Sequence, residues 1–148
     1  MKRFILTIVI VISSQSWTGL VADTSTGAEL IFAKFFESFT NADTEGVVAL
    51  FAEDALFWGT GSQTLVRDIE GIRSYFSGLG NFSPGQRIAS AVEISIVELN
   101  EQQEMVSGTW QVSKEGSAQG TILRVSAVVS NKEGEWKIIQ FHNSRVPE

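Results

Sequence analysis

Four successive stretches in the second half of the chain alternate apolar and polar residues with a period of two. The stretches are centred on residues 91–96, 106–112, 122–129 and 136–142, and polar turns lie between them at 100–104, 114–120 and 131–135. A period of two is typical of β-strands, and turns this short join antiparallel neighbours. The pattern therefore predicts a four-stranded antiparallel meander.

The first half of the chain has helical periodicity instead. Thr26 and Glu29 have the spacing of a capping box, and Ile31, Phe35 and Phe39 then recur every four residues. This arrangement predicts an amphipathic helix with one wide apolar stripe. Such a stripe needs a partner, and the sheet offers a face for it to cover.

Two further helices are expected after Asp43 and Asp68, because aspartate is a preferred N-cap residue. Two short strands are expected between them, over 55–58 and 64–66. Helices followed by a meander indicate an α+β fold, with N-terminal helices packed on a curved antiparallel β-sheet. A sheet curled around the first helix leaves a pocket at its open end. Apolar residues on both faces of the 122–129 strand indicate that the outer face is partly covered by self-association.

The N-terminus has the layout of a secretory signal peptide. Lys2 and Arg3 precede the nine apolar residues 4–12, a run too short to span a bilayer, which takes about 20. Cleavage after Ala22 would leave residues 23–148 as one exported domain, with Ala28 as the second cleavage position. The alternatives are a short N-terminal anchor or a buried first helix.

Composition excludes several classes of function. The 148 residues include 17 acidic and 11 basic side chains, a net charge of −6 that argues against a nucleic-acid partner. There is no cysteine and one histidine, so thiolate zinc sites and sites with two histidines are excluded. Gly59-Thr60-Gly61 lacks the lysine and the following helix of a phosphate loop. We therefore expect no cofactor, no metal ion and no stable membrane span.

Three segments carry a family resemblance: LFAEDALFWGT, EGIRSYFSGL and the C-terminal WKIIQFHNSRVP. They resemble the nuclear transport factor 2-like superfamily of cone-shaped α+β domains. Within it, the chain resembles the SnoaL-like branch and the association (hub) domain of calcium/calmodulin-dependent protein kinase II. The resemblance extends over residues 27–147. No kinase segment accompanies it, since the nucleotide and catalytic loops are both missing.

The resemblance implies a pocket on the concave side of the sheet, and dimers or larger rings formed through the outer face. The hub pocket is lined by several arginines and a histidine, and it takes small carboxylates. Arg124 matches one of those arginines, whereas Asn143 stands where the hub has another arginine. A smaller, more apolar pocket for an apolar or carboxylate ligand is therefore implied.

The candidate ligand-binding residues are Arg124, Trp58, Trp110, Tyr75 and Asn143. Arg124 lies between apolar neighbours and needs either a ligand carboxylate or a structural ion pair, for example with Asp54 or Asp68. The tryptophans can line a pocket or simply fill the core.

The candidate catalytic residues are Asp54 and His142. A strand-end histidine and a rim carboxylate can transfer protons, as some members of this superfamily do. The alternatives are a hydrogen-bonded histidine and a capping aspartate.

Three functions therefore remain open from the sequence. The first is an exported, self-associating domain that binds a small molecule. The second is an isomerase, cyclase or dehydratase that uses Asp54 or His142. The third is an oligomerisation module with a collapsed pocket.

Overall fold

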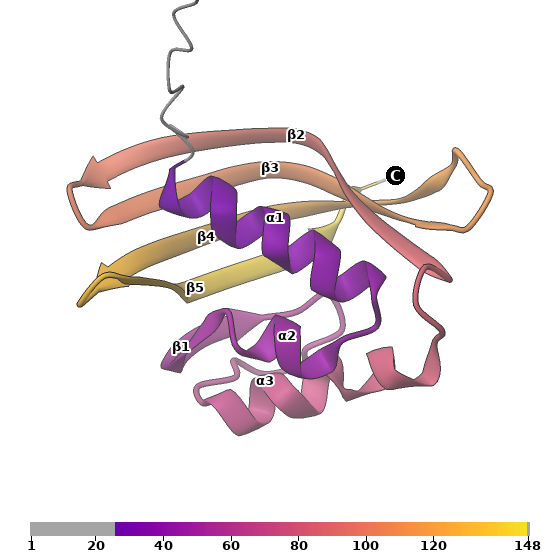
Figure 1. Cartoon of the computed structure of the whole chain (residues 1–148), viewed down its shortest axis with the longest axis horizontal. Coiled ribbons are helices and arrows are strands. Elements are labelled where there is room, and N and C mark those ends of the chain that lie inside the picture. Colours follow the sequence, from indigo (N-terminus) through magenta and orange to yellow (C-terminus); the bar gives the residue numbers. More distant parts are fainter. Residues whose placement is uncertain (1–25, 148) are drawn as a thin grey trace, which may run out of the picture.

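A curved five-stranded sheet with helices packed on one face forms the structure (Figure 1). The computed structural model describes residues 26–147. Its elements are α1 (Gly27–Thr40), α2 (Thr44–Val48), β1 (Phe51–Trp58), α3 (Ile69–Phe76), the 3₁₀ helix η1 (Ser77–Asn81), β2 (Arg87–Asn100), β3 (Gln103–Lys114), β4 (Gly120–Lys132) and β5 (Glu135–Arg145). The predicted signal peptide, residues 1–22, lies outside the described residues and stays a prediction. Within residues 26–147, no helix has both the length and the apolar character needed to cross a membrane.

The strand order is β1-β5-β4-β3-β2, and the predicted antiparallel meander of β2 to β5 is confirmed. The first strand, β1, lies parallel to β5 at the edge of the sheet. This parallel pair connects the helical half of the chain to its C-terminus. It has no signature in the local alternation of residues.

The three predicted helix starts are confirmed by their caps. The Thr26 hydroxyl accepts a hydrogen bond from the Glu29 amide, and the Glu29 carboxylate accepts one from the Thr26 amide. The carboxylates of Asp43 and Asp68 accept bonds from amides three residues later, at 2.8 and 2.7 Å. Each cap satisfies amide groups that the first helical turn leaves without partners.

The prediction of two short strands in the first half is wrong in part. Residues 55–58 belong to the longer strand β1, which begins at Phe51. Residues 64–66 form only an isolated bridge, in which Phe57 and Val66 exchange backbone hydrogen bonds at 2.9 and 3.0 Å. The strand that pairs along β1 is β5, and Val66 bridges to Phe57 on the other edge of β1.

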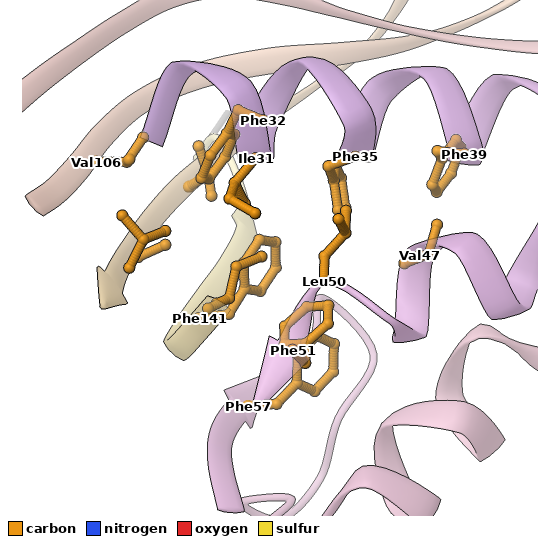
Figure 2. Packing of buried hydrophobic residues seen from close by; sticks show 14 of the residues in the cluster. Ile31, Phe32, Phe35, Phe39, Val47, Leu50, Phe51, Phe57, Val106 and Phe141 are labelled. Carbon is orange, nitrogen blue, oxygen red and sulfur yellow. The ribbon is translucent and has the colours of Figure 1, made fainter. Parts of the chain in front are cut away.

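The core lies between α1 and the inner face of the sheet, and Figure 2 shows its aromatic character. Phe35 is 1% exposed and is the centre of this cluster. Its ring lies 5.6 Å from those of Trp110 and Phe141 and 6.1 Å from that of Phe76, in edge-on and tilted geometries that aromatic pairs favour. The phenylalanines of α1 therefore cover the sheet as predicted.

Two bulges decide which strand residues face this core. In β5, Gln140 pairs with Val128 while Ile138 pairs with Val129, so Ile139 is an extra residue on that strand. A bulge of this kind reverses the alternation that follows it. Ile138 and Phe141 are consequently both buried. A second bulge at Val92 in β2 has the same effect there, because the register shifts between Ala91 and Glu93.

Candidate functional site

A cavity of about 850 Å³ lies between the inner face of the sheet and the helices. Its opening is at the end of the sheet where β2 and β4 begin and β3 and β5 end, the end to which the long β3–β4 turn extends in Figure 1. Eight aromatic residues line it, including these six from α1, β1, α3, β3 and β5: Phe35, Phe39, Phe57, Phe76, Trp110 and Phe141. The wall is thus continuous with the aromatic core.

Charged side chains gather where the cavity opens. Arg87, Lys114 and Arg145 line this part of the cavity together with one carboxylate, that of Glu115. This opening, which we call the mouth, has three cationic side chains and one anionic one, although the whole chain has a net charge of −6.

Arg87 is held at the mouth by aromatic rings. Its guanidinium carbon lies 5.1 Å from the ring centroid of Phe39 and 4.7 Å from that of Phe82, within the range of cation–π attraction. Among residues 26–147, no carboxylate oxygen lies within ion-pair distance of it. Arg87 is thus oriented at the cavity without using its capacity to bind an anion.

A chain of hydrogen bonds runs along one wall of the cavity. The indole nitrogen of Trp110 donates to Oδ1 of Asn143 at 2.8 Å, and Nδ2 of Asn143 donates to the hydroxyl of Thr60 at 2.7 Å. Trp110 and Asn143 are 3% and 7% exposed. The amide of a buried asparagine needs such partners, because an unpaired polar group is costly in an apolar wall.

Three of the predicted ligand-binding residues lie together in the cavity: Trp110, Asn143 and Tyr75. The ring of Tyr75 stands 4.8 Å from that of Phe57 and lies over Gly59, where a Cβ would come within 2.2 Å of it. A side chain at position 59 would therefore displace Tyr75 from the cavity.

The prediction that Arg124 faces the cavity is wrong. Its neighbours Leu123 and Val125 are buried on the inner face of β4, so Arg124 lies on the outer face, exposed. Its guanidinium donates to the carbonyl oxygen of Arg145 at 3.1 Å, and no ion pair with Asp54 or Asp68 is found among the described residues.

His142 also lies on the outer face, opposite Ser126. The regular alternation predicted for β5 grouped it with Ile138, which is in the core. The bulge at Ile139 reverses that alternation, and Asn143 instead points inward.

Asp54 and Trp58 are exposed residues of β1 that do not line the cavity. Asp54 is the fourth residue of this strand rather than its start. Neither candidate catalytic residue, Asp54 or His142, lines the cavity.

Sequence reasoning did not find Arg87, Phe82 or Thr60. Arg87 begins β2 directly after a turn, and its alternation with the buried Ala89 is a signal for the inner face. The signal is weak because the alternation that starts at Arg87 extends only to Ala91, where the bulge at Val92 interrupts it.

The outer face is a different surface. Two cross-strand rows cross its centre, the first formed by Ser95, Ser107, Ser126 and His142 and the second by Glu93, Thr109, Arg124 and Ser144. They line a shallow depression of about 570 Å³. Apolar residues on this face, such as Val97 and Ile122, lie beyond these rows and are 49% and 44% exposed.

Residues 29–148 match the sequence profile of the SnoaL-like domain. The chain belongs to the SnoaL-like domain family. No curated protein matches it. The predicted resemblance to this branch and its cone-shaped fold is thus confirmed.

Solved structures with the same fold have little sequence in common with this SnoaL-like domain. A Xanthomonas campestris protein, provisionally named a calcium/calmodulin-dependent protein kinase II association domain, is 20% identical with a TM-score of 0.70, over 85% of this chain and 92% of that one. A nuclear transport factor 2-like protein of unknown function from Pseudomonas putida is 11% identical with a TM-score of 0.71, over 82% and 85%. A provisionally named scytalone dehydratase from Novosphingobium aromaticivorans is 17% identical with a TM-score of 0.66, over 82% and 83%. At such identities the likeness establishes the fold alone.

Proposed function

We propose that this SnoaL-like domain binds a small molecule with an apolar body and an acidic group in its inner-face cavity. The observation that carries the proposal is the aromatic wall leading to a mouth with three cationic side chains. Small-molecule sites usually combine a mostly apolar wall with a few placed polar groups. The third possibility from the sequence, a collapsed pocket, is disfavoured by the volume of about 850 Å³.

Arg87 is the side chain that would hold the acidic group. Its guanidinium is pre-oriented between Phe39 and Phe82, so little side-chain entropy is lost when it binds an anion. A guanidinium can bind a carboxylate with two parallel hydrogen bonds, which are stronger than neutral ones. This role replaces the one that the resemblance implied for Arg124.

The test compares variants of the two arginines by their affinity for 2-naphthoate, measured by isothermal titration calorimetry. Arg87→Met should lower the affinity about tenfold or more, as expected for loss of a charge-assisted hydrogen bond. Arg87→Lys keeps the positive charge and should retain part of the affinity. Arg124→Met is the matched control on the outer face and should leave the affinity unchanged. The proposal fails if 2-naphthoate does not bind, or if Arg87→Met and Arg124→Met behave alike.

A proton-transfer enzyme on this fold is the alternative function, and one solved relative is provisionally named a dehydratase. Its support in this chain is the phenol of Tyr75 in the cavity. The geometry favours binding, because Asp54 and His142 lie away from the cavity where a substrate would sit.

We also propose that the domain self-associates through the outer face of the sheet. Glu93 and Arg124 lie in one cross-strand row with Thr109 between them. A two-fold axis that passes near Thr109 and runs parallel to β3 would place Glu93 of each copy against the partner's Arg124, which is the self-complementarity that a symmetric dimer needs. Val97 and Ile122 would be covered in the same contact.

Charge reversal tests this dimer by light scattering coupled to gel filtration. Glu93→Arg alone should shift the protein to monomer, because like charges would then face each other across the axis. The double variant Glu93→Arg/Arg124→Glu should restore the dimer. A native monomer at micromolar concentration, or a double variant that does not recover, would refute the interface.

We infer in addition that residues 1–22 direct export, on the strength of Lys2-Arg3 and the nine apolar residues that follow. Mass spectrometry of exported material should find an N-terminus near Asp23. A mature protein that retains Met1 would contradict this.

A further inference from the structure

The hydrogen bonds from Trp110 to Thr60 have a direction that chemistry fixes. An indole nitrogen can only donate, so the atom of Asn143 facing Trp110 must be the amide oxygen. The NH₂ group of Asn143 then faces Thr60 and donates to its hydroxyl oxygen. The indole thus orients the amide, and the amide orients the hydroxyl.

The hydroxyl of Thr60 is left with a proton to donate. A hydroxyl has one proton and two lone pairs, and here one lone pair is occupied by Asn143. Within residues 26–147, no protein acceptor takes the proton of the Thr60 hydroxyl. Thr60 is also an exposed residue of the cavity lining, so this proton is accessible to a bound molecule.

We propose that Thr60 is a hydrogen-bond donor that selects ligands with a carbonyl or similar acceptor oxygen, and that Asn143 and Trp110 are the residues that position it. This inference rests on the proposed ligand-binding function and adds the polar chemistry of the cavity wall. Arg87 at the mouth can only donate. The free proton of Thr60 and the guanidinium of Arg87 therefore favour a molecule that presents acceptor oxygens.

The buried position of Asn143 makes the orientation stable. Asn143 is 7% exposed, and rotating its amide would place an NH₂ group against the indole N–H of Trp110. Two donors facing each other in a buried site would leave both unsatisfied. The hydroxyl of Thr60 therefore keeps its donor role whether or not a ligand is bound.

Two probes of similar shape separate this inference from the binding function itself. They are 2-acetylnaphthalene, which has a carbonyl, and 2-isopropenylnaphthalene, in which a CH₂ group replaces the carbonyl oxygen. The native protein should bind the ketone about tenfold more tightly, as expected for one added neutral hydrogen bond. Thr60→Val keeps the shape and removes the hydroxyl, so the preference should disappear. Thr60→Ser is the matched control and should keep it.

Asn143→Asp tests the direction of the chain. A carboxylate has two acceptor oxygens, so one can still accept from Trp110 while the other accepts the proton of Thr60. The hydroxyl is still present but no longer has a proton for the ligand, and the preference for the ketone should be lost here as well. A merely structural role for Asn143 would weaken both probes equally.

The outcomes are distinct. A ketone preference that survives Thr60→Val overturns this inference and leaves the proposed function intact. Failure of the native protein to bind either naphthalene or 2-naphthoate overturns the proposed function and this inference together. A preference that is lost in Thr60→Val and kept in Thr60→Ser supports the inference even if Asn143→Asp does not fold.

Discussion

Leu123 and Arg124 are neighbours in β4, yet they belong to opposite faces of the same sheet. On the inner face, Leu123 meets the aromatic wall and is 8% exposed. On the outer face, Arg124 lies among serines and one threonine, Thr109, in a shallow depression. The inner face has the rings of α1 to pack against, whereas no described element covers the outer one.

The difference shows why a residue's type does not settle its role. An arginine among apolar strand neighbours suggests a buried charge, which would need an ion-pair partner or a ligand carboxylate. Arg124 instead alternates out of the core, and its exposed guanidinium donates to the carbonyl oxygen of Arg145. The arginine that does reach the cavity, Arg87, begins a strand after a turn and is held by Phe39 and Phe82.

The largest expected difference between the two faces is in stability. It is measured by truncating two adjacent residues of β4, one on each face. Leu123→Ala removes buried methyl groups and should lower the free energy of unfolding by about 2–3 kcal/mol, the low end for such changes because the site borders a cavity. Ile122→Ala, at a residue 44% exposed, should cost less than about 1 kcal/mol. Urea unfolding of both variants measures this, and equal losses would break the distinction between the faces.

A smaller effect is expected from the ion pair that joins the helices covering the inner face. Arg73 of α3 donates to Glu45 of α2 at 2.9 Å, and this hydrogen bond lowers the pKa of the Glu45 carboxyl. A lowered pKa means that the pair contributes stability above the usual carboxyl range and loses it as the pH falls through the folded-state value. Both side chains are exposed, so solvent screening keeps the contribution small.

Glu45→Gln should therefore be slightly less stable than the native protein at about pH 7, and the gap should be narrower at about pH 3. Added salt should reduce the gap at neutral pH, since it screens exposed charges. Urea unfolding at the two pH values, with and without salt, measures this. A gap that widens in acid would contradict the assignment of the pair.

The local patterns of the sequence were sufficient for the helices and the meander. Thr26, Asp43 and Asp68 cap helices as their side chains predict, because capping depends on a few adjacent residues. The alternation of Leu123 and Val125 likewise places both on one face. The parallel pairing of β1 with β5 could not be found this way, because it joins residues that are far apart in the chain.

The site was less predictable, and the reason is specific. The single extra residue Ile139 reverses the faces of everything after it in β5, so Asn143 enters the cavity and His142 leaves it. The apolar pattern does not reveal the bulge, because each candidate face has one isoleucine and one aromatic residue: Trp136 and Ile138 on one, Ile139 and Phe141 on the other. Trp110 and Tyr75 were found because large aromatic residues are enriched in any such wall.

The small molecule of the proposed function binds at the inner face of the sheet. The most direct test is an intermolecular NOE experiment with methyl-labelled protein and 2-naphthoate. Contacts from the naphthyl protons to the methyl groups of Leu79, Val112 and Leu123, which line the cavity, are the predicted result. Contacts to Ile122 and Val128 on the outer face would contradict it.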